Sequence, residues 1–487
     1  MIIKRLGLFL SVAILGFVVA VAALYIYWVR SGPPLQLWHT AELTVEFTAE
    51  MADEIQTFVD YQRLEERLFT QLEDQVYAHT GTGPEYTLVR YSAGSAADPQ
   101  RRQPNWNRSF ELSAEMPAGG VLLLHGMSDS PYSLRALGET LNQQGYWVLG
   151  LRLPGHGTAP SGLLTIRWED LAVAVRLGME HLASKVGKRP IHMIGYSTGA
   201  PLALDYVLNT LEGEVAPTPA GLVLISPAIA ISPAAALAQW KVRLALVPGL
   251  EKLAWTQILP EFDPFKYNSF TSNAGVQVHR LTRSVARRIE TRASSGPIEH
   301  FPPTLVFLST VDATVSADAV IDNLLEHLAP DRHELVLFDI NRNRVKSTLL
   351  VSDPGPLTDR LMTNDKLPFG LTLIANENTE SSTVVSHYKP PLSAQASTTP
   401  LDLAWPRGVI SLSHVALPFP PDDPLYGQRP PGNENILFLG QIDFQGERGL
   451  LQFPADWLLR LRYNPFYSFL ERRVLEWVDD ISGEGGN

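Results

Sequence analysis

The chain has 487 residues, 45% of them hydrophobic, and it exceeds one typical domain while having enough apolar residues for a large core. Its formal net charge is −12 and it has no basic stripe, which argues against nucleic acid as a partner. It contains no cysteine, so disulfides and cysteine-ligated metals are excluded. No metalloprotease histidine spacing and no glycine-rich phosphate loop occurs, and we expect no metal.

The first apolar segment begins after Lys4 and Arg5, and residues 6–29 carry no charge. That length can span a bilayer hydrocarbon core of about 30 Å, and tyrosine and tryptophan at its far end suit the membrane interface. A cleaved signal peptide with Ala20-Val21-Ala22 as its site is the alternative, but the apolar run continues past it. We therefore expect residues 1–30 to be a membrane anchor.

The charges beside this segment predict its orientation. Lys4 and Arg5 precede the apolar run and Arg30 follows it, and basic residues favour the cytoplasmic side. We expect a single-pass protein with a cytoplasmic N-terminus. The rest of the chain would lie outside the cytoplasm, in the periplasm if the source is a Gram-negative bacterium.

Residues 31–104 are expected to form a helical extension and a linker. The apolar residues of 45–78 recur at roughly helical spacing, which predicts an amphipathic acidic helix. Residues 79–106 are rich in glycine, proline and serine, which predicts a surface linker. The helix is interpreted as an extension packed on the following domain, with a dimer contact or a stalk as the alternative. The oligomeric state stays open.

Strands and helices alternate from about residue 105, which predicts a parallel sheet. The buried-strand run at 121–124 ends in His125-Gly126, and the run at 147–151 is followed by LPGHG at 153–157. The glycines of this second loop permit close backbone approach.

The stretch GYSTG at 195–199 is the strongest chemical signal in the chain. It lies between an apolar run at 191–194 and a helical pattern at 201–211, so it has the strand, sharp turn and helix of a nucleophile elbow. Its glycines allow the turn, which would raise the Ser197 hydroxyl beside the unpaired N–H groups of the helix start. An ordinary strand-to-helix turn is the alternative.

Two later residues complete a nucleophile, acid and base set. Asp312 follows a predicted strand at 303–308, where its carboxylate can reach an imidazole, although a turn or helix cap also explains this aspartate. His414 follows a β-branched run at 409–413, predicted as the last strand. A neutral imidazole can take a serine proton while a carboxylate fixes its tautomer. The competing histidines are His156, His300, His327, His333 and His387.

Two segments interrupt the alternation. Residues 228–300 contain an alanine-rich helical pattern, PFKYNSF, and a basic helix whose arginines form a solvated face or, as the alternative, bind an anionic lipid or substrate. The insertion at about 340–405 predicts irregular loops with short β runs at 347–351 and 382–385, and it shows no chemistry. A final helix is predicted from about 465 to 480.

The motifs resemble the α/β-hydrolases grouped with monoacylglycerol lipases and serine aminopeptidase-like hydrolases. The resemblance lies in HGMSDSP, LPGHG, GYSTG, the strand-end Asp312 and SLSHVALPFPPDD around His414, and residues 263–283 resemble the lid of that family. It covers roughly residues 105–480. One departure is the gap between Asp312 and His414, which is usually a few tens of residues and here reflects the late insertion.

The resemblance implies an α/β fold, the α/β-hydrolase fold, with a mostly parallel sheet flanked by helices in a domain at 105–487. It also implies a lid at about 228–300, a Ser197–Asp312–His414 triad, and an oxyanion hole formed by the Met127 and Thr198 N–H groups. No cofactor is implied. The family order of serine, acid and histidine also disfavours His156 as the base.

These features together predict a membrane-anchored serine hydrolase that cleaves carboxylic esters, with acylglycerols as candidate substrates. A serine aminopeptidase-like peptidase is the alternative within enzymes, and it needs a carboxylate pair for the free amino group of its substrate. A non-catalytic scaffold is the third alternative. The expected partners are a small ester or lipid substrate and the membrane.

Overall fold

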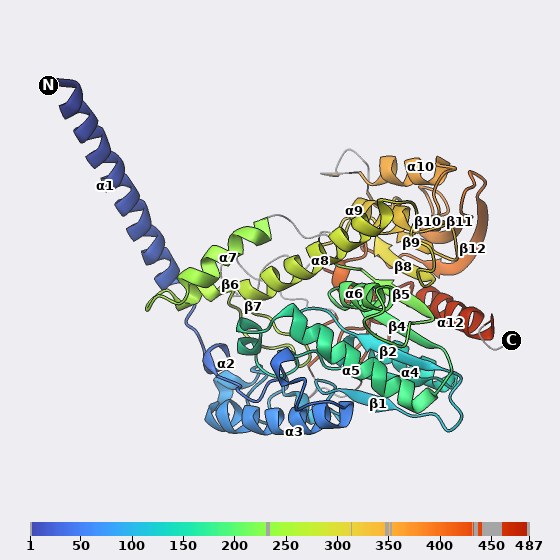
Figure 1. Cartoon of the computed structure of the whole chain (residues 1–487), viewed down its shortest axis with the longest axis horizontal. Helices are drawn as coiled ribbons and strands as arrows, with labels where there is room; N and C mark the ends of the chain where they lie inside the picture. Colours follow the sequence, from blue (N-terminus) through green and yellow to red (C-terminus); the bar gives the residue numbers. More distant parts are fainter. Residues whose placement is uncertain are drawn as a thin grey trace.

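The computed structural model describes residues 2–229, 234–312, 314–345, 350, 353–430, 432, 437–440 and 460–484. Helix α1 (Ile2–Ser31) projects away from the body of the molecule (Figure 1). Within the described residues, Ala13–Ser31 is the one helical segment long and apolar enough to cross a membrane, with a mean hydropathy of 1.9. A membrane anchor and a signal sequence both fit this helix.

A ten-stranded sheet forms the centre of the protein, in the order β1-β3-β2-β4-β5-β8-β9-β10-β11-β12. The strands from β3 to β10 in that order are parallel, and β1, β11 and β12 are antiparallel at the two edges. The mostly parallel sheet is as expected. The strands are β1 (Phe110–Leu112), β2 (Gly120–Leu124), β3 (Trp147–Leu151), β4 (Ile191–Tyr196), β5 (Gly221–Ile225), β8 (Thr304–Ser309), β9 (Glu334–Phe338), β10 (Gly370–Asn376), β11 (Thr383–Lys389) and β12 (Ser397–Ala404).

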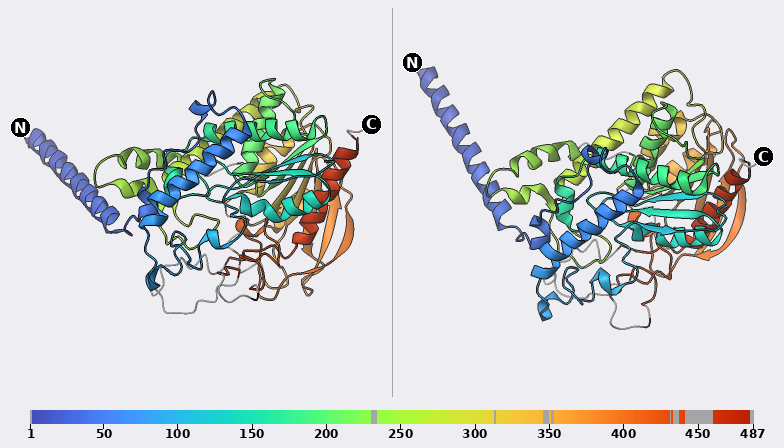
Figure 2. Two further views of the ribbon diagram at one scale, coloured as in Figure 1. Left: turned by 90° about the horizontal axis from the view of Figure 1, so that it is seen from below. Right: turned by 60° about the horizontal axis from the view of Figure 1, so that its bottom comes forward.

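Helices cover both faces of this sheet (Figure 2). Successive strand residues point to opposite faces, so Leu122 and Leu124 join one hydrophobic core while Val121 and Leu123 join the other. The first core includes α5 (Trp168–Val186) and α6 (Gly199–Leu211), and the second includes α4 (Arg135–Gln143) and α12 (Tyr467–Glu484). Helix α12 fulfils the prediction of a C-terminal helix docked on the core.

The N-terminal extension packs on the domain more closely than the sequence predicts. Its helix, α3 (Phe58–Gln75), is shorter than the expected 45–78. Residues 79–106 are not a surface linker, because Arg90 and Tyr91 are buried. Arg90 Nη1 donates to the Asp263 carbonyl over 3.3 Å and Tyr91 Oη donates to the Thr158 carbonyl over 3.0 Å. The proline, glycine and serine content therefore reflects turns that follow the surface of the domain.

The extension also supplies the partners of a buried arginine in the domain. Arg152, which follows β3, has a 1% exposed side chain and lies 3.0 Å from both Glu46 and Glu65. Tyr61 Oη donates to the Arg152 carbonyl over 2.7 Å. A buried guanidinium needs such partners, so residues 46–65 and the domain are expected to fold as one unit.

The prediction of irregular loops at 340–405 is wrong for most of residues 370–404, while the short β run expected at 382–385 is confirmed as the start of β11. Strand β10 pairs in parallel with β9, and β11 and β12 extend the sheet from it. The apolar residues of these strands are weak signals in a serine- and threonine-rich segment. Helix α10 (Gly355–Thr363) precedes them, and most of the β run expected at 347–351 lies outside the described residues. The insertion is thus one edge of the central sheet.

Residues 228–300 lie between β5 and β8 as a mainly helical excursion. They contain α7 (Ala234–Leu244), the 3-10 helix η7 (Glu251–Ala254), the short strands β6 (Trp255–Gln257) and β7 (Phe270–Thr271), and α8 (Ser272–Ala293). The arginines of α8 are not one solvated face. Arg288 pairs with Asp205 and Glu212 of the α6 segment at 2.8 Å, and Arg292 Nη2 donates to the Leu211 carbonyl over 2.5 Å.

Candidate active site

A sharp turn between β4 and α6 carries Ser197. Its φ is +52°, in the left-handed region that serine rarely adopts, and such a residue costs on the order of 1–3 kcal/mol. A Cβ atom on Gly199 would lie 2.0 Å from the Leu124 carbonyl oxygen, and one on Gly195 would lie 2.6 Å from the Ala200 nitrogen. Both glycines are therefore required where the helix crosses the strands.

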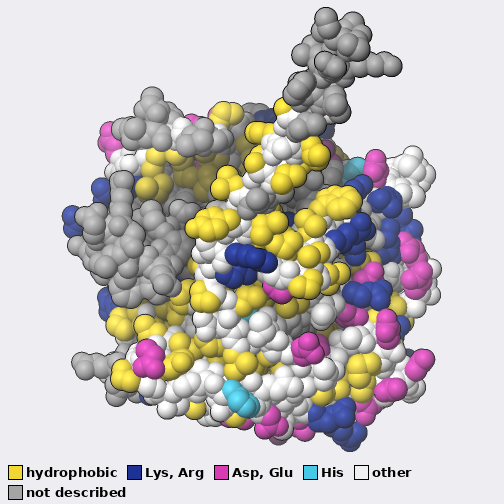
Figure 3. All heavy atoms as spheres, turned by 90° about the vertical axis from the view of Figure 1, so that its left-hand side faces the viewer, with side chains coloured by type: hydrophobic (Ala, Val, Ile, Leu, Met, Phe, Trp, Pro, Cys, Tyr) yellow, Lys and Arg dark blue, Asp and Glu magenta, His cyan; other side chains and the backbone are white. Residues whose placement is uncertain are grey.

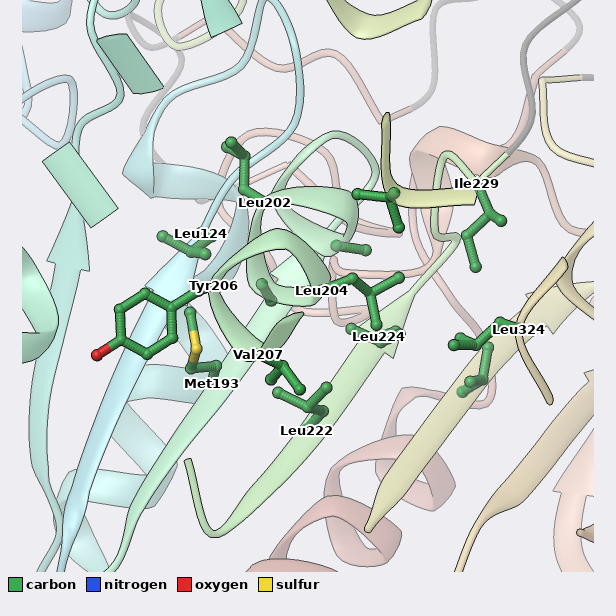
Figure 4. Close-up of a cluster of buried hydrophobic side chains, with 14 of the residues drawn as sticks. Leu124, Met193, Leu202, Leu204, Tyr206, Val207, Leu222, Leu224, Ile229 and Leu324 are labelled. Atoms are coloured by element: carbon green, nitrogen blue, oxygen red, sulfur yellow. The ribbon is translucent and has the colours of Figure 1, made fainter. Parts of the chain in front are cut away.

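The helix after the turn is held against the sheet by its apolar face. Figure 4 shows Leu204 and Val207 of α6 facing Leu222 and Leu224 of β5, and all four side chains are buried. The Ser197 N–H donates to the Ile225 carbonyl over 2.9 Å. This packing holds the backbone of Ser197 in place and leaves its side chain at the carboxyl end of β4.

The structure brings Ser197, Asp312 and His414 into one hydrogen-bonded chain. His414 Nε2 lies 3.0 Å from Ser197 Oγ, and His414 Nδ1 lies 2.8 Å from Asp312 Oδ2. The other carboxylate oxygen of Asp312 accepts the N–H groups of Thr314 and Val315 at 2.8 and 3.0 Å. The Asp312 side chain is fully buried and its two oxygens have partners, so the carboxylate can fix the imidazole ring.

The segment that positions His414 is not the strand that the sequence predicts. Residues 409–413 are not a strand, and His414 begins the 3-10 helix η10 (His414–Ala416). The backbone instead crosses the ends of β8 and β9, because Ser309 Oγ donates to the Leu412 carbonyl over 3.0 Å. Asn341 binds the same segment twice, from its N–H to Ile410 at 2.7 Å and from Nδ2 to Val409 at 2.8 Å.

Met127 and Thr198 lie near Ser197, and all three residues line one cavity. Thr198 is the N-cap residue of α6, and a Cβ on Gly126 would come within 3.1 Å of Ser197 Cβ. Among the described residues, neither the Met127 nor the Thr198 N–H has a hydrogen-bond acceptor. Two free N–H groups beside a serine hydroxyl can stabilise negative charge on a bound oxygen.

His156, the nearest competing histidine in sequence, lies below this site. Its ring is buried, with Nδ1 2.9 Å from the Pro154 carbonyl and Nε2 3.2 Å from Met127 Sδ. Burial lowers the pKa of His156 to about 4. His156 is thus a neutral residue that packs against the Met127 side chain. His333 directly precedes β9 and His387 lies on β11, and neither is hydrogen-bonded to Ser197 in the described structure.

A cavity of about 470 Å³ opens onto Ser197 and His414. Side chains of the 228–300 excursion and of residues after His414 form much of its wall, and many of them are apolar. The apolar lining residues include Ala228, Phe270, Val278, Val415 and Phe419. A cavity of this size and character suits a small ligand with an apolar chain.

Two polar residues of the cavity were not identified from the sequence as site residues. Lys266 Nζ lies 3.3 Å from the Asp129 carboxylate, and both side chains line the cavity. Burial raises the pKa of Asp129, and the charge of Lys266 opposes that shift. Both residues lie in quoted motifs, Asp129 in HGMSDSP and Lys266 in PFKYNSF, but only the structure places the two motifs side by side.

Comparisons with known proteins agree with this fold. Residues 115–340 match the family described as serine aminopeptidase, S33. The chain is 34% identical over 123 residues to a thermostable monoacylglycerol lipase of Bacillus sp. (strain H-257), covering 25% of this chain and 46% of that protein. It is 37% identical over 84 residues to a carboxylesterase of Bacillus subtilis (strain 168), covering 17% and 34%. The chain thus matches less than half the length of either relative.

A solved structure of a Paleococcus ferrophilus monoacylglycerol lipase is also similar, with 21% identity and a TM-score of 0.36 over 47% of this chain and 88% of that chain. The family match covers the turn that carries Ser197 and strand β8, which precedes Asp312. The family match and the two relatives, with the mostly parallel sheet flanked by helices, support the α/β-hydrolase superfamily for this chain.

Proposed function

We propose that the protein is a membrane-anchored serine hydrolase that cleaves carboxylic esters through an acyl-enzyme on Ser197. The single observation that carries the proposal is the chain of hydrogen bonds from Asp312 through His414 to Ser197. A non-catalytic scaffold has no need for this arrangement, which includes a serine in a strained backbone conformation.

The proposed reaction begins when Ser197 Oγ attacks the acyl carbonyl carbon while His414 Nε2 takes the hydroxyl proton. Asp312 accepts the Nδ1–H hydrogen bond and stabilises the imidazolium that forms. The Met127 and Thr198 N–H groups bind the oxyanion of the tetrahedral intermediate, and one such donor is typically worth 10²–10³ in kcat.

The intermediate then collapses, and His414 gives its proton to the departing alcohol. Water enters, loses a proton to His414 and attacks the acyl-enzyme carbonyl. The second tetrahedral intermediate releases the acid and restores the Ser197 hydroxyl. No metal is required by this sequence of steps.

The lining of the cavity favours an ester over a peptide with a free amino group. Asp129 is the one carboxylate among the described lining residues, and Lys266 pairs with it. Arg460 and Arg462 also line the cavity, so its charged groups are mainly cationic. An aminopeptidase-like activity would need unpaired carboxylates for the substrate ammonium group, and the described lining offers none. The apolar wall suits an acyl chain, and acylglycerols are the substrates we propose to try first.

The test compares Ser197→Ala with Ser226→Ala in an assay of p-nitrophenyl esters from acetyl to palmitoyl. Ser226 is a matched control, because it also ends a strand, has a positive φ of +44° and is buried. We expect Ser197→Ala to lose about 10⁶ in kcat and Ser226→Ala to retain it. Equal activity of the two variants would refute the assignment of Ser197, and faster cleavage of alanine p-nitroanilide than of any ester would favour the peptidase.

We also propose that α1 is an uncleaved anchor with a cytoplasmic N-terminus and an extracytoplasmic catalytic domain. The support is the apolar helix Ala13–Ser31 and the basic Lys4 and Arg5 before it. Protease added to cells with a permeabilised outer layer and an intact inner membrane should digest the domain. Protection until the inner membrane is lysed would reverse this topology.

A further inference from the structure

Exposed large hydrophobic side chains gather at the end of α7. Outside α1, the described residues include ten of them, and four fall within residues 240–247. They are Trp240 at 62%, Leu244 at 46%, Leu246 at 84% and Val247 at 47% exposure. Scattered single residues of this kind need no explanation, but a contiguous group of four marks an interaction surface.

This group lies beside the point where α1 ends. Arg30 Nε donates to the Gly249 carbonyl over 3.4 Å, and Lys252 Nζ donates to the carbonyls of Arg30 and Gly32 over 3.0 and 2.6 Å. Figure 1 shows α7 next to the end of α1, on the side of the molecule from which α1 projects. The apolar group is therefore adjacent to the residues at which the chain would emerge from the bilayer.

Basic side chains accompany the apolar ones. Lys241 and Arg243 lie within the group, and the Arg243 guanidinium is 5.2 Å from the centre of the Trp240 ring. Figure 3 shows this face, where hydrophobic side chains and Lys or Arg side chains lie together below the end of α1. Tryptophan with lysine and arginine is the composition typical of a surface at the level of lipid headgroups.

The same surface is connected to the catalytic cavity through α8. Helix α7 packs on α8, and Gly275 and Val278 of α8 line the cavity beside Ser197. Helix α7 therefore contacts the helix that forms part of the cavity wall.

We infer that residues 240–252, the docking segment, lie on the surface of the bilayer that holds α1, with Trp240, Leu244, Leu246 and Val247 among the lipid headgroups. This inference rests on the proposed insertion of α1. The anchor holds the chain at the membrane, and the docking segment fixes the orientation of the domain, so that a lipid ester has a short path from the bilayer to Ser197. A second copy of the chain is the competing occupant of this surface.

The absence of cysteine makes a direct test available, because one introduced cysteine can be labelled alone. The full-length chain is reconstituted in phosphatidylcholine and phosphatidylglycerol vesicles with an NBD fluorophore at Leu246→Cys. Val18→Cys in α1 reports on the anchor. Met116→Cys is the matched control, since Met116 is 85% exposed in the loop between β1 and β2, away from α1 (Figure 1).

We expect nitroxide-labelled lipids to quench the label at 246 from a shallow acyl position and the label at 18 from a deep one. The label at 116 should respond only to aqueous iodide. Quenching at 18 without quenching at 246 overturns the docking inference and leaves the anchor intact. Quenching at neither position overturns both. A label at 246 that is shielded from lipid and from iodide shows that a second chain covers the surface.

An activity measurement completes the test. The double variant Trp240→Glu, Leu246→Glu should hydrolyse a long-chain ester embedded in the vesicles about tenfold more slowly, because two apolar side chains no longer favour the docked orientation. Its rate on a soluble short-chain ester should equal that of the wild type, which would show an intact site. Unchanged hydrolysis of the embedded ester would contradict the inference.

Discussion

The proposed nucleophile and the proposed base lie in two regions that are built differently. Ser197 depends on residues close to it in sequence, with β4, α6 and the glycines at 195 and 199 fixing its turn. His414 lies 102 residues from Asp312, and strands β10 to β12 form between them. One region is thus a local motif, and the other is a loop that returns from the far edge of the sheet.

The difference shows what keeps a site intact when a chain gains a long insertion. The additional strands extend the sheet beyond β9, while the returning segment 409–414 is bound again to the ends of β8 and β9. Ser309 and Asn341 make those bonds. The position of His414 therefore depends on a few hydrogen bonds at the carboxyl end of the sheet rather than on a strand that ends at this residue.

The largest expected effect tests whether the returning loop supplies the base. We expect His414→Ala to lose about 10⁶ in kcat on a soluble ester, as much as loss of the nucleophile, because the two act as a unit. The control is His387→Ala on β11, whose ring bonds to Thr398 Oγ1 at the sheet edge, and it should retain the wild-type rate. The opposite ranking of these two variants would refute the assignment.

The next largest effect on kcat is expected from Asp312, whose carboxylate is hydrogen-bonded to His414. Asp312→Asn should lose about 10⁴ in kcat, because the amide no longer fixes the imidazole tautomer. Asp339 follows β9 as Asp312 follows β8, but it pairs with Arg342 at 2.5 Å. We expect Asp339→Asn to lower thermal stability and to keep kcat. An inactive Asp339→Asn beside an active Asp312→Asn would move the acid to the next strand.

A smaller effect on kcat is expected from a substitution that loosens the loop carrying His414. Asn341→Ala removes the side-chain bond to the Val409 carbonyl and the bond from Asn376, and it leaves the half-buried Val409 carbonyl without this partner. We expect kcat to fall about 10–100-fold from displacement of His414, and stability to fall by about 1–3 kcal/mol. Asn343→Ala, on the same turn and bonded only to the Thr379 carbonyl, is the control. Equal kcat in both variants would show that the loop is positioned without Asn341.

The smallest expected effect concerns pH and leaves the site untouched. Burial lowers the pKa of His333, at the start of β9, to about 4 from an ordinary value of 6.5. The unfolded chain therefore binds this proton first, and stability is lost as the pH falls from about 6.5 to 4. At pH 5 this histidine should cost on the order of 2 kcal/mol. His333→Gln should show a flatter loss of unfolding free energy between pH 7 and 5 than the exposed control His79→Gln, and equal slopes would contradict this account.

The sequence predicted the local region well and the returning region poorly. The glycines of GYSTG and the apolar runs of β2, β3, β4 and β8 predicted their elements, since each signal lies within a few residues of the element that it forms. Strands β10 and β12 were missed and β11 was predicted only at its start, because the apolar residues of these strands alternate irregularly. Residues 409–413 have strand-like composition, yet tertiary hydrogen bonds hold them as a loop. The pairing of Asp129 with Lys266 could not be predicted from the sequence either, because the two residues are 137 positions apart.

The identity of the nucleophile is the central claim, and the site of covalent labelling tests it most directly. The full-length protein is treated with a fluorophosphonate, digested and analysed by mass spectrometry. We predict one phosphonyl adduct, on Ser197, which forms far more slowly in His414→Ala. An adduct on another serine, or no adduct on a folded protein that hydrolyses esters, would contradict the account.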